Sequence, residues 1–185
     1  MAKKVFVITG PIGSGKSTAI KYLKSKGFST VDLDKVSNDI LNSEESITFL
    51  KEEFPKAIVK DEVKREILAD IVFKNKEKLT ILENYLHPKV LYELQEIIQR
   101  TVDELFVEVS APKNIYKDFD CIVIYCQADT RIKRLKERGM DYEDIQNRMA
   151  NQKDDDWWKN LGIVIENDDL NDLYLNLDKI IIQNL

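Results

Sequence analysis

The residues best suited to chemistry lie near the N-terminus, in the run Gly10-Pro-Ile-Gly-Ser-Gly-Lys-Ser17. The run follows the apolar segment Val5–Thr9, and a helical pattern begins at Lys16. Glycines let such a loop fold tightly, so that successive main-chain N–H groups converge on phosphate oxygens. The N-terminus of the following helix adds about half a positive charge. We therefore predict a nucleotide site, and a purely structural turn is the weaker alternative.

Each position of this loop has an expected role. Lys16 is predicted to bridge the outer phosphates, and the hydroxyl of Ser17 to hold Mg²⁺. Thr18 begins the helix beside the inner phosphates. The predicted nucleotide-binding set is Gly13, Ser14, Gly15, Lys16, Ser17 and Thr18.

Other motifs narrow the class of nucleotide protein. A signalling GTPase needs an Asn-Lys-x-Asp motif, and the nearest string, Asn151-Gln-Lys-Asp154, has the wrong order. A motor ATPase carries four apolar residues followed by Asp-Glu; the nearest analogue here is Phe106-Val-Glu108. The remaining class is a kinase that phosphorylates a small molecule.

Two carboxylates close the second apolar segment, in Val31-Asp-Leu-Asp34. Alternation along a strand places Asp32 and Asp34 on one face at its carboxyl end, where open α/β sheets bind ligands. One of them, preferably Asp34, would accept the proton of an attacking hydroxyl while its neighbour assists the metal's water shell. Capping of a helix that starts near Lys35 is the structural alternative.

Arginine use points to a second cluster. The chain has 22 Lys and six Arg, and Arg131, Arg134, Arg138 and Arg148 fall within 18 residues. Arginine is a planar, bidentate donor suited to phosphate. We predict that Arg134 and Arg138 end a helix beside Gly139, where a lid over about residues 138–155 closes over phosphates. A solvated face that pairs with Glu137 and Asp141 is the alternative.

Four further residues have open roles. Arg65 is a candidate contact for the acceptor's phosphate. His87 precedes Pro88, which predicts that it leaves helical conformation and caps the next helix, or that it contacts substrate. Trp157 and Trp158 are expected to pack the lid onto the core rather than to stack on a base.

Composition excludes several functions. The net charge of −5 argues against an extended nucleic-acid or membrane surface, and no apolar run reaches ten residues. The first apolar stretch, Val5 to Ile8, is too short for a signal peptide. Cys121 and Cys126 lie on opposite faces of one strand and cannot bridge each other. We expect a cytoplasmic protein with reduced thiols, and a monomer.

Strand and helix patterns alternate, which predicts an α/β fold with a mainly parallel sheet. The predicted strands are Val5–Thr9, Thr30–Asp32, Leu105–Val109, Cys121–Tyr125 and Ile163–Glu166. The predicted helices are 16–26, 37–42, 46–53, 63–74, 78–85, 88–101, 130–138, 142–152 and 170–183. About 70 residues between the second and third strands are almost wholly helical, so we predict a helical lobe over about 36–102.

Together these residues make the chain resemble bacterial dephospho-CoA kinases, P-loop kinases related in fold to nucleoside monophosphate kinases. The resemblance covers nearly the whole length. It is carried by Thr9–Thr18, Asp32-x-Asp34, Arg65 ahead of Val72-Phe73, Leu86-His-Pro88, Arg134, Arg138, Arg148-Met-Ala-Asn-Gln152 and Val164-Ile-Glu-Asn167.

The resemblance implies a single three-layer P-loop kinase domain, 1–185, with a five-stranded mainly parallel sheet, a helical acceptor-binding lobe and an Arg-rich lid. It implies Mg²⁺-dependent transfer of the ATP γ-phosphate to the ribose 3′-hydroxyl of dephospho-CoA. It places Asp34 at the acceptor hydroxyl, with Asp32 nearby, and the lid arginines on the ATP phosphates. Arg65 and His87 would face the acceptor, and Asn167 the adenine.

The chain also departs from that family. The usual Pro-Leu-Leu-Phe-Glu after the third strand is replaced at about Glu108-Val-Ser-Ala-Pro112, which weakens the match to the acceptor-binding loop. A role for Glu108 in the metal's outer shell is an alternative that we do not adopt. Trp158 replaces a basic residue, and Leu161-Gly162 replaces Ala-Asp. The alternatives are a nucleoside monophosphate or shikimate-type kinase, and a nucleotide-dependent regulatory protein.

Overall fold

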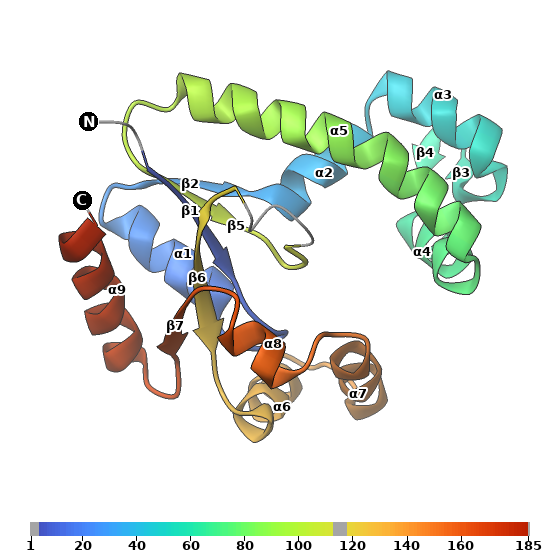
Figure 1. Ribbon diagram of the computed structural model, residues 1–185. Coiled ribbons are helices and arrows are strands. Elements are labelled where there is room, and N and C mark those ends of the chain that lie inside the picture. Colours follow the sequence, from blue (N-terminus) through green and yellow to red (C-terminus); the bar gives the residue numbers. More distant parts are fainter. Residues whose placement is uncertain (1–3, 113–117, 185) are drawn as a thin grey trace. The chain divides into compact units, whose positions relative to one another are not determined.

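A parallel five-stranded sheet organises the part of the chain that carries the glycine-rich loop. The computed structural model describes residues 4–112 and 118–184, and the sheet has the strand order β2-β5-β1-β6-β7 (Figure 1). The strands are β1 (Val5–Thr9), β2 (Ser29–Asp32), β5 (Leu105–Glu108), β6 (Asp120–Tyr125) and β7 (Ile163–Glu166). All their pairings are parallel. The predicted α/β fold with a parallel five-stranded sheet is confirmed.

Helices pack on this sheet because its strands are apolar on both faces. On one face, α1 (Lys16–Ser25) and α9 (Leu170–Asn184) bury Leu23 and Leu173 against Phe6 and Ile8 of β1. The short α8 (Asp155–Lys159) packs against β6. Two more helices, α6 (Ala128–Glu137) and α7 (Tyr142–Ala150), lie between β6 and α8 in the chain.

The chain divides into two compact units. The sheet unit contains the residues up to Asp32 and those from Thr101 on, and the helical unit is Leu33–Arg100. The helical unit comprises α2 (Leu33–Leu41), α3 (Glu44–Glu53), the 3₁₀ turn η1 (Pro55–Ala57), the two-residue strands β3 (Ile58–Val59) and β4 (Glu62–Val63), α4 (Arg65–Lys74) and α5 (Lys76–Arg100). It has its own core, in which Leu50, Phe54 and Ala57 are at most 1% exposed.

The prediction of two helices separated at His87-Pro88 is wrong. Helix α5 runs without interruption from Lys76 to Arg100 with Pro88 inside it, so His87 is helical and caps no helix. Buried Leu82 and Leu94 flank Pro88 on the same helix. Their packing outweighs the local cost of proline, and the exposed Asn84, four residues earlier, lets water reach the carbonyl that loses its partner.

Other local predictions also needed correction. Strand β2 ends at Asp32, and Asp34 lies in the first turn of α2, so strand alternation does not apply to it. An acidic residue there is favoured by the helix dipole, which local strand periodicity could not reveal. Val63 belongs to the β3–β4 pair rather than to α4, and α8 was not predicted.

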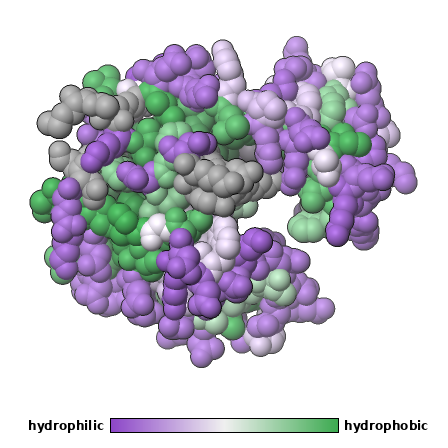
Figure 2. All heavy atoms as spheres, viewed as in Figure 1, coloured by the Kyte–Doolittle hydropathy of each residue, from purple (hydrophilic) through white to green (hydrophobic). Residues whose placement is uncertain are grey.

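Hydrophilic side chains cover much of the visible surface of both units, as the 33% content of charged residues requires (Figure 2). Hydrophobic residues gather over the sheet unit in this view. In the described part of the chain, no helix combines the length and apolar character needed to cross a membrane.

Proline within α5 generates a stability prediction. We expect Pro88→Ala to raise the free energy of unfolding by about 1–3 kcal/mol, because alanine restores a helical N–H and removes a steric clash. Urea denaturation followed by circular dichroism measures the change. The matched control is Pro55→Ala at the start of η1, where proline is favourable and no gain is expected. A destabilised Pro88→Ala variant would show that the helix breaks at this point.

Candidate active site

The glycine-rich loop leaves the sheet between two neighbouring strands. The side chain of Thr9 donates to the carbonyl of Val109 over 2.8 Å, which ties the end of β1 to the end of β5. On the other side, a Cβ at Gly10 would collide with the carbonyl of Ile124 in β6. Gly10 also has a φ of 146°, so a residue without a side chain is required there. The loop is therefore fixed at the carboxyl edge of the sheet.

The functional groups of the loop are held close to its main chain. Lys16 Nζ donates to the carbonyls of Gly10 at 2.9 Å and Pro11 at 3.2 Å. Helix α1 begins at Lys16 behind Gly15, whose φ is 104° and which has no side chain to cap the helix. The positive end of α1 and the lysine ammonium therefore lie at the same loop, as binding of a polyphosphate requires.

A carboxylate reaches the loop from the neighbouring strand. The hydroxyl of Ser17 donates to Glu108 Oε1 over 2.8 Å, and Glu108, at the end of β5, is only 9% exposed. Asp32 is paired in register with Glu108, so the two side chains project to the same face of the sheet. Asp32 and Glu108 thus end neighbouring strands on one face of the sheet, and Glu108 contacts Ser17 in the first turn of α1.

These oxygens fit a magnesium ion that is shared with a nucleotide. Within residues 4–112 and 118–184, no group of three or more His, Cys, Asp or Glu side chains could hold a metal without other ligands. Mg²⁺ prefers hard oxygen ligands and is commonly held by one or two protein groups together with substrate phosphates. The Ser17 hydroxyl and the Glu108 carboxylate form such a partial donor set.

Asn167 braces the loop from the end of β7. Its side-chain amide donates to the carbonyl of Ser14 over 2.7 Å, and its main-chain N–H donates to Tyr125. Asn167 is 1% exposed, and a Cβ at Gly15 would collide with its side-chain nitrogen. An adenine contact for Asn167 remains a prediction, whereas its contact with the loop is present in the structure.

The arginines of the predicted lid occupy different environments. Arg131 is buried and pairs with Asp155 at 3.1 Å, while the hydroxyl of Tyr125 donates to the same carboxylate at 2.8 Å. Arg134 Nη1 donates to Cys126 Sγ over 3.4 Å. Arg138 is the C-cap residue that follows α6, and it is exposed. Arg131 therefore has a structural partner, and Arg138 is open to solvent.

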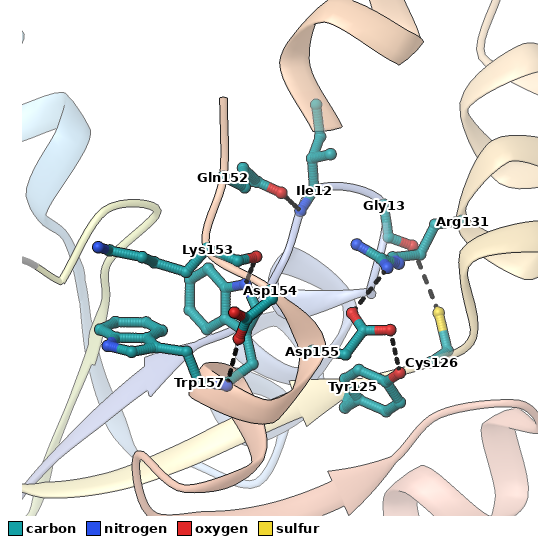
Figure 3. A network of polar contacts seen from close by, with 11 residues as sticks. Ile12, Gly13, Tyr125, Cys126, Arg131, Gln152, Lys153, Asp154, Asp155 and Trp157 are labelled. Carbon is teal, nitrogen blue, oxygen red and sulfur yellow. Dashed lines mark hydrogen bonds and ion pairs between the residues drawn. The ribbon is translucent and has the colours of Figure 1, made fainter. Parts of the chain in front are cut away.

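The segment that follows α7 contacts the glycine-rich loop (Figure 3). The side-chain carbonyl of Gln152 accepts the N–H of Ile12 at 2.9 Å. Trp158 is 3% exposed and its indole N–H donates to the carbonyl of Lys153, so this tryptophan packs into the sheet unit as expected. The segment after α7 is thus joined to the loop by the side-chain hydrogen bond of Gln152.

The remaining candidates lie in the helical unit. Asp34 is in the first turn of α2, Arg65 is the first residue of α4, and His87 is in the middle of α5. All three are exposed. Their proposed roles toward an acceptor remain predictions.

Two residues that contact the loop were not among the predicted site residues: Glu108, whose role near the metal was an alternative not adopted, and Gln152, which had no predicted role. Glu108 ends a predicted strand, but only the pairing of β5 beside β1 shows that it reaches Ser17. Gln152 closes the Arg148–Gln152 motif, and its contact with Ile12 spans 140 positions of the sequence. The polar end of a buried strand was the available signal for Glu108.

A parallel sheet with this strand order and a Gly-x-x-x-x-Gly-Lys-Ser loop at its carboxyl edge defines a P-loop kinase. The family model for dephospho-CoA kinase matches residues 4–172. The chain belongs to the dephospho-CoA kinase family.

Individual relatives agree with that assignment. A dephospho-CoA kinase from Campylobacter jejuni is 34% identical over 181 residues, which cover 89% of this chain and 88% of that protein. A solved structure of dephospho-CoA kinase from C. jejuni has a TM-score of 0.72 and 28% identity, and covers 98% of this chain and 96% of its own. The crystal structure of TT1252 from Thermus thermophilus has a TM-score of 0.93 and 28% identity, with coverage of 100% and 99%.

Both cysteines are buried free thiols, as predicted, and Cys126 Sγ lies 3.9 Å from the Gly13 carbonyl in the loop. Burial raises the pKa of the Cys126 thiol, and burial with nearby Asp120 raises the pKa of Cys121 to about 11. Both groups therefore stay protonated in the folded protein at neutral pH.

The Cys121 thiol predicts a loss of stability in alkali. In the unfolded chain a thiol loses its proton near pH 8.5, whereas the folded protein keeps the Cys121 proton until about pH 11. The folded state then binds more protons, so the free energy of unfolding falls as pH rises from about 9 to 11. Urea denaturation across this range should show a shallower fall in Cys121→Ala. Equal slopes in the two proteins would contradict the assignment.

Proposed function

We propose that the chain transfers the γ-phosphate of ATP to the ribose 3′-hydroxyl of dephospho-CoA, giving CoA and ADP. Membership of the dephospho-CoA kinase family supports this proposal. The observation that carries it is the Ser17–Glu108 hydrogen bond of 2.8 Å beside Lys16, because it places metal-competent oxygens at a polyphosphate loop.

In this mechanism the protein positions groups and neutralises charge, with little covalent work. Lys16 exchanges its contacts with the Gly10 and Pro11 carbonyls for oxygens of the outer phosphates. Arg134 and Arg138 donate to phosphate oxygens as negative charge builds up. Bound Mg²⁺ supplies further neutralisation, with the Ser17 hydroxyl and the Glu108 carboxylate as its protein-side contacts.

The acceptor side of the reaction is assigned to carboxylates and to the helical unit. Asp34 accepts the proton of the 3′-hydroxyl as its oxygen bonds to phosphorus and the bond to the leaving ADP breaks. Asp32 lies beside Glu108 in the sheet register and supports the acceptor and the metal's water shell. Arg65 and His87 bind the acceptor through its phosphate groups.

A coupled assay of ADP release tests the function. Wild-type protein should turn over ATP with dephospho-CoA and not with AMP, CMP or shikimate. Turnover with one of the other acceptors, and none with dephospho-CoA, would replace this function with another small-molecule kinase activity. Slow hydrolysis that no acceptor stimulates would indicate a regulatory protein.

Two substitutions test the assigned roles in the same assay. Lys16→Ala should lower kcat/KM by about 10²–10³-fold, because a charged donor to the transferring phosphate is lost.

Asp34→Asn should lower kcat by about 10²–10⁴-fold, because the amide cannot accept the proton. Asp39→Asn, at another exposed aspartate of α2, is the matched control and should be unchanged. Full activity of folded Asp34→Asn would remove its role.

Glu108→Gln tests the metal contact. The amide can still accept the Ser17 hydrogen bond but has no charge, so the Mg²⁺ concentration for half-maximal rate should rise about tenfold. A magnesium titration of initial rate at saturating nucleotide measures the shift. Asp103→Asn, at an exposed residue before the opposite end of β5, should leave the titration unchanged. An unshifted Glu108→Gln curve would exclude Glu108 from the metal site.

A further inference from the structure

The peptide between Pro11 and Ile12 is held at both of its polar atoms. Its carbonyl accepts from Lys16 Nζ at 3.2 Å and from the N–H of Ser14 at 3.2 Å. Its N–H donates to Gln152 Oε1 at 2.9 Å. In a trans peptide these two atoms point in opposite directions, so contacts on both sides fix the orientation of the peptide plane.

The Gln152 side chain is presented from a well-anchored segment. Its main-chain N–H donates to Met149 at the end of α7, and the carbonyl of the next residue, Lys153, accepts from the buried Trp158. Asp154 then caps α8 by accepting the N–H of Trp157 (Figure 3). The oxygen of Gln152 therefore reaches the loop from a backbone that is fixed on both sides.

The loop needs such an external restraint. Gly10 and Gly13 flank the Pro11–Ile12 segment with φ values of 146° and 78°, and the conformational freedom of glycine lets this segment reorient. If the Pro11–Ile12 peptide flipped, the Lys16 ammonium and the Ser14 N–H would both lose the Pro11 carbonyl as their acceptor. Polyphosphate binding depends on the direction of the loop's N–H groups, so the flip would lower nucleotide affinity.

We infer that Gln152 is a positioning residue of the nucleotide site, which sets the Pro11–Ile12 peptide and, through its carbonyl, the resting place of Lys16. This inference rests on the proposed use of ATP. It also explains how the segment after α7 is coupled to the loop without itself touching the reacting atoms.

The test replaces the acceptor oxygen and leaves the bulk. Gln152→Met has a side chain of similar length that cannot accept the Ile12 N–H. Loss of one such hydrogen bond should weaken binding of Mg²⁺-ATP, measured without acceptor, by about five- to tenfold. KM for ATP should rise in step, while KM for dephospho-CoA stays constant. Asn151→Ala, at the neighbouring exposed residue, should bind ATP normally.

Amide hydrogen exchange measures directly whether the Ile12 N–H is protected by its hydrogen bond to Gln152. The Ile12 N–H should exchange faster in Gln152→Met, while the Ala19 N–H, bonded to Gly15 within α1, keeps its protection. Gln152→Glu retains a side-chain oxygen and should keep Ile12 protected, which distinguishes loss of the acceptor from loss of the side chain.

Each outcome decides the inference. Unchanged ATP affinity in Gln152→Met overturns the positioning role, whether or not Ile12 exchange changes. Weaker ATP binding with unchanged Ile12 exchange overturns the hydrogen bond as its cause. A lower kcat with an unchanged KM for ATP also overturns the positioning role, because nucleotide affinity is then intact. Failure of wild-type protein to phosphorylate dephospho-CoA would reject the proposed function instead, because ATP binding and exchange are measured without acceptor.

Discussion

A chain with a net charge of −5 can hold a polyphosphate only where dipoles and a few cations are concentrated. In this protein that concentration depends on the direction of main-chain N–H groups between Gly10 and Thr18. The direction is imposed from outside the loop, because Asn167 holds the Ser14 carbonyl and Gln152 holds the Ile12 N–H. The loop is therefore a product of the sheet unit as a whole.

The strand register determines which side chains meet this loop. Pairing of β1 with β5 places Val109 opposite the end of β1, where its N–H donates to the carbonyl of Ile8 and its carbonyl accepts from the side chain of Thr9. The same register leaves Glu108 at the Ser17 hydroxyl. One parallel pairing thus supplies both the anchor of the loop and the acidic group beside it.

Local patterns were sufficient for the five strands of the parallel sheet, for the loop between β1 and α1 and for the free cysteines, because each depends on neighbours within a few residues. They failed where distant residues decide the outcome. Pro88 predicts a helix break, yet packing of Leu82 and Leu94 keeps α5 continuous. Asp34 was placed by strand alternation, but β2 ends two residues earlier. The contacts of Glu108 and Gln152 span 91 and 140 positions, so no pattern of neighbouring residues identifies their partners.

The helical unit Leu33–Arg100 forms a long connection between the neighbouring strands β2 and β5, and a long connection lowers the stability of the sheet unit. Closing a flexible loop costs free energy that grows only with the logarithm of length, so lengthening a connection from ten to seventy residues adds only about 2 kcal/mol. The helical unit offsets this cost with a separate core around Leu50 and Phe54. In that unit the ring of Phe49 stacks on the ring of Tyr85, with 3.8 Å between the ring centroids. Because the helical unit stabilises itself, its surface residues can diverge without disturbing the register that shapes the phosphate loop.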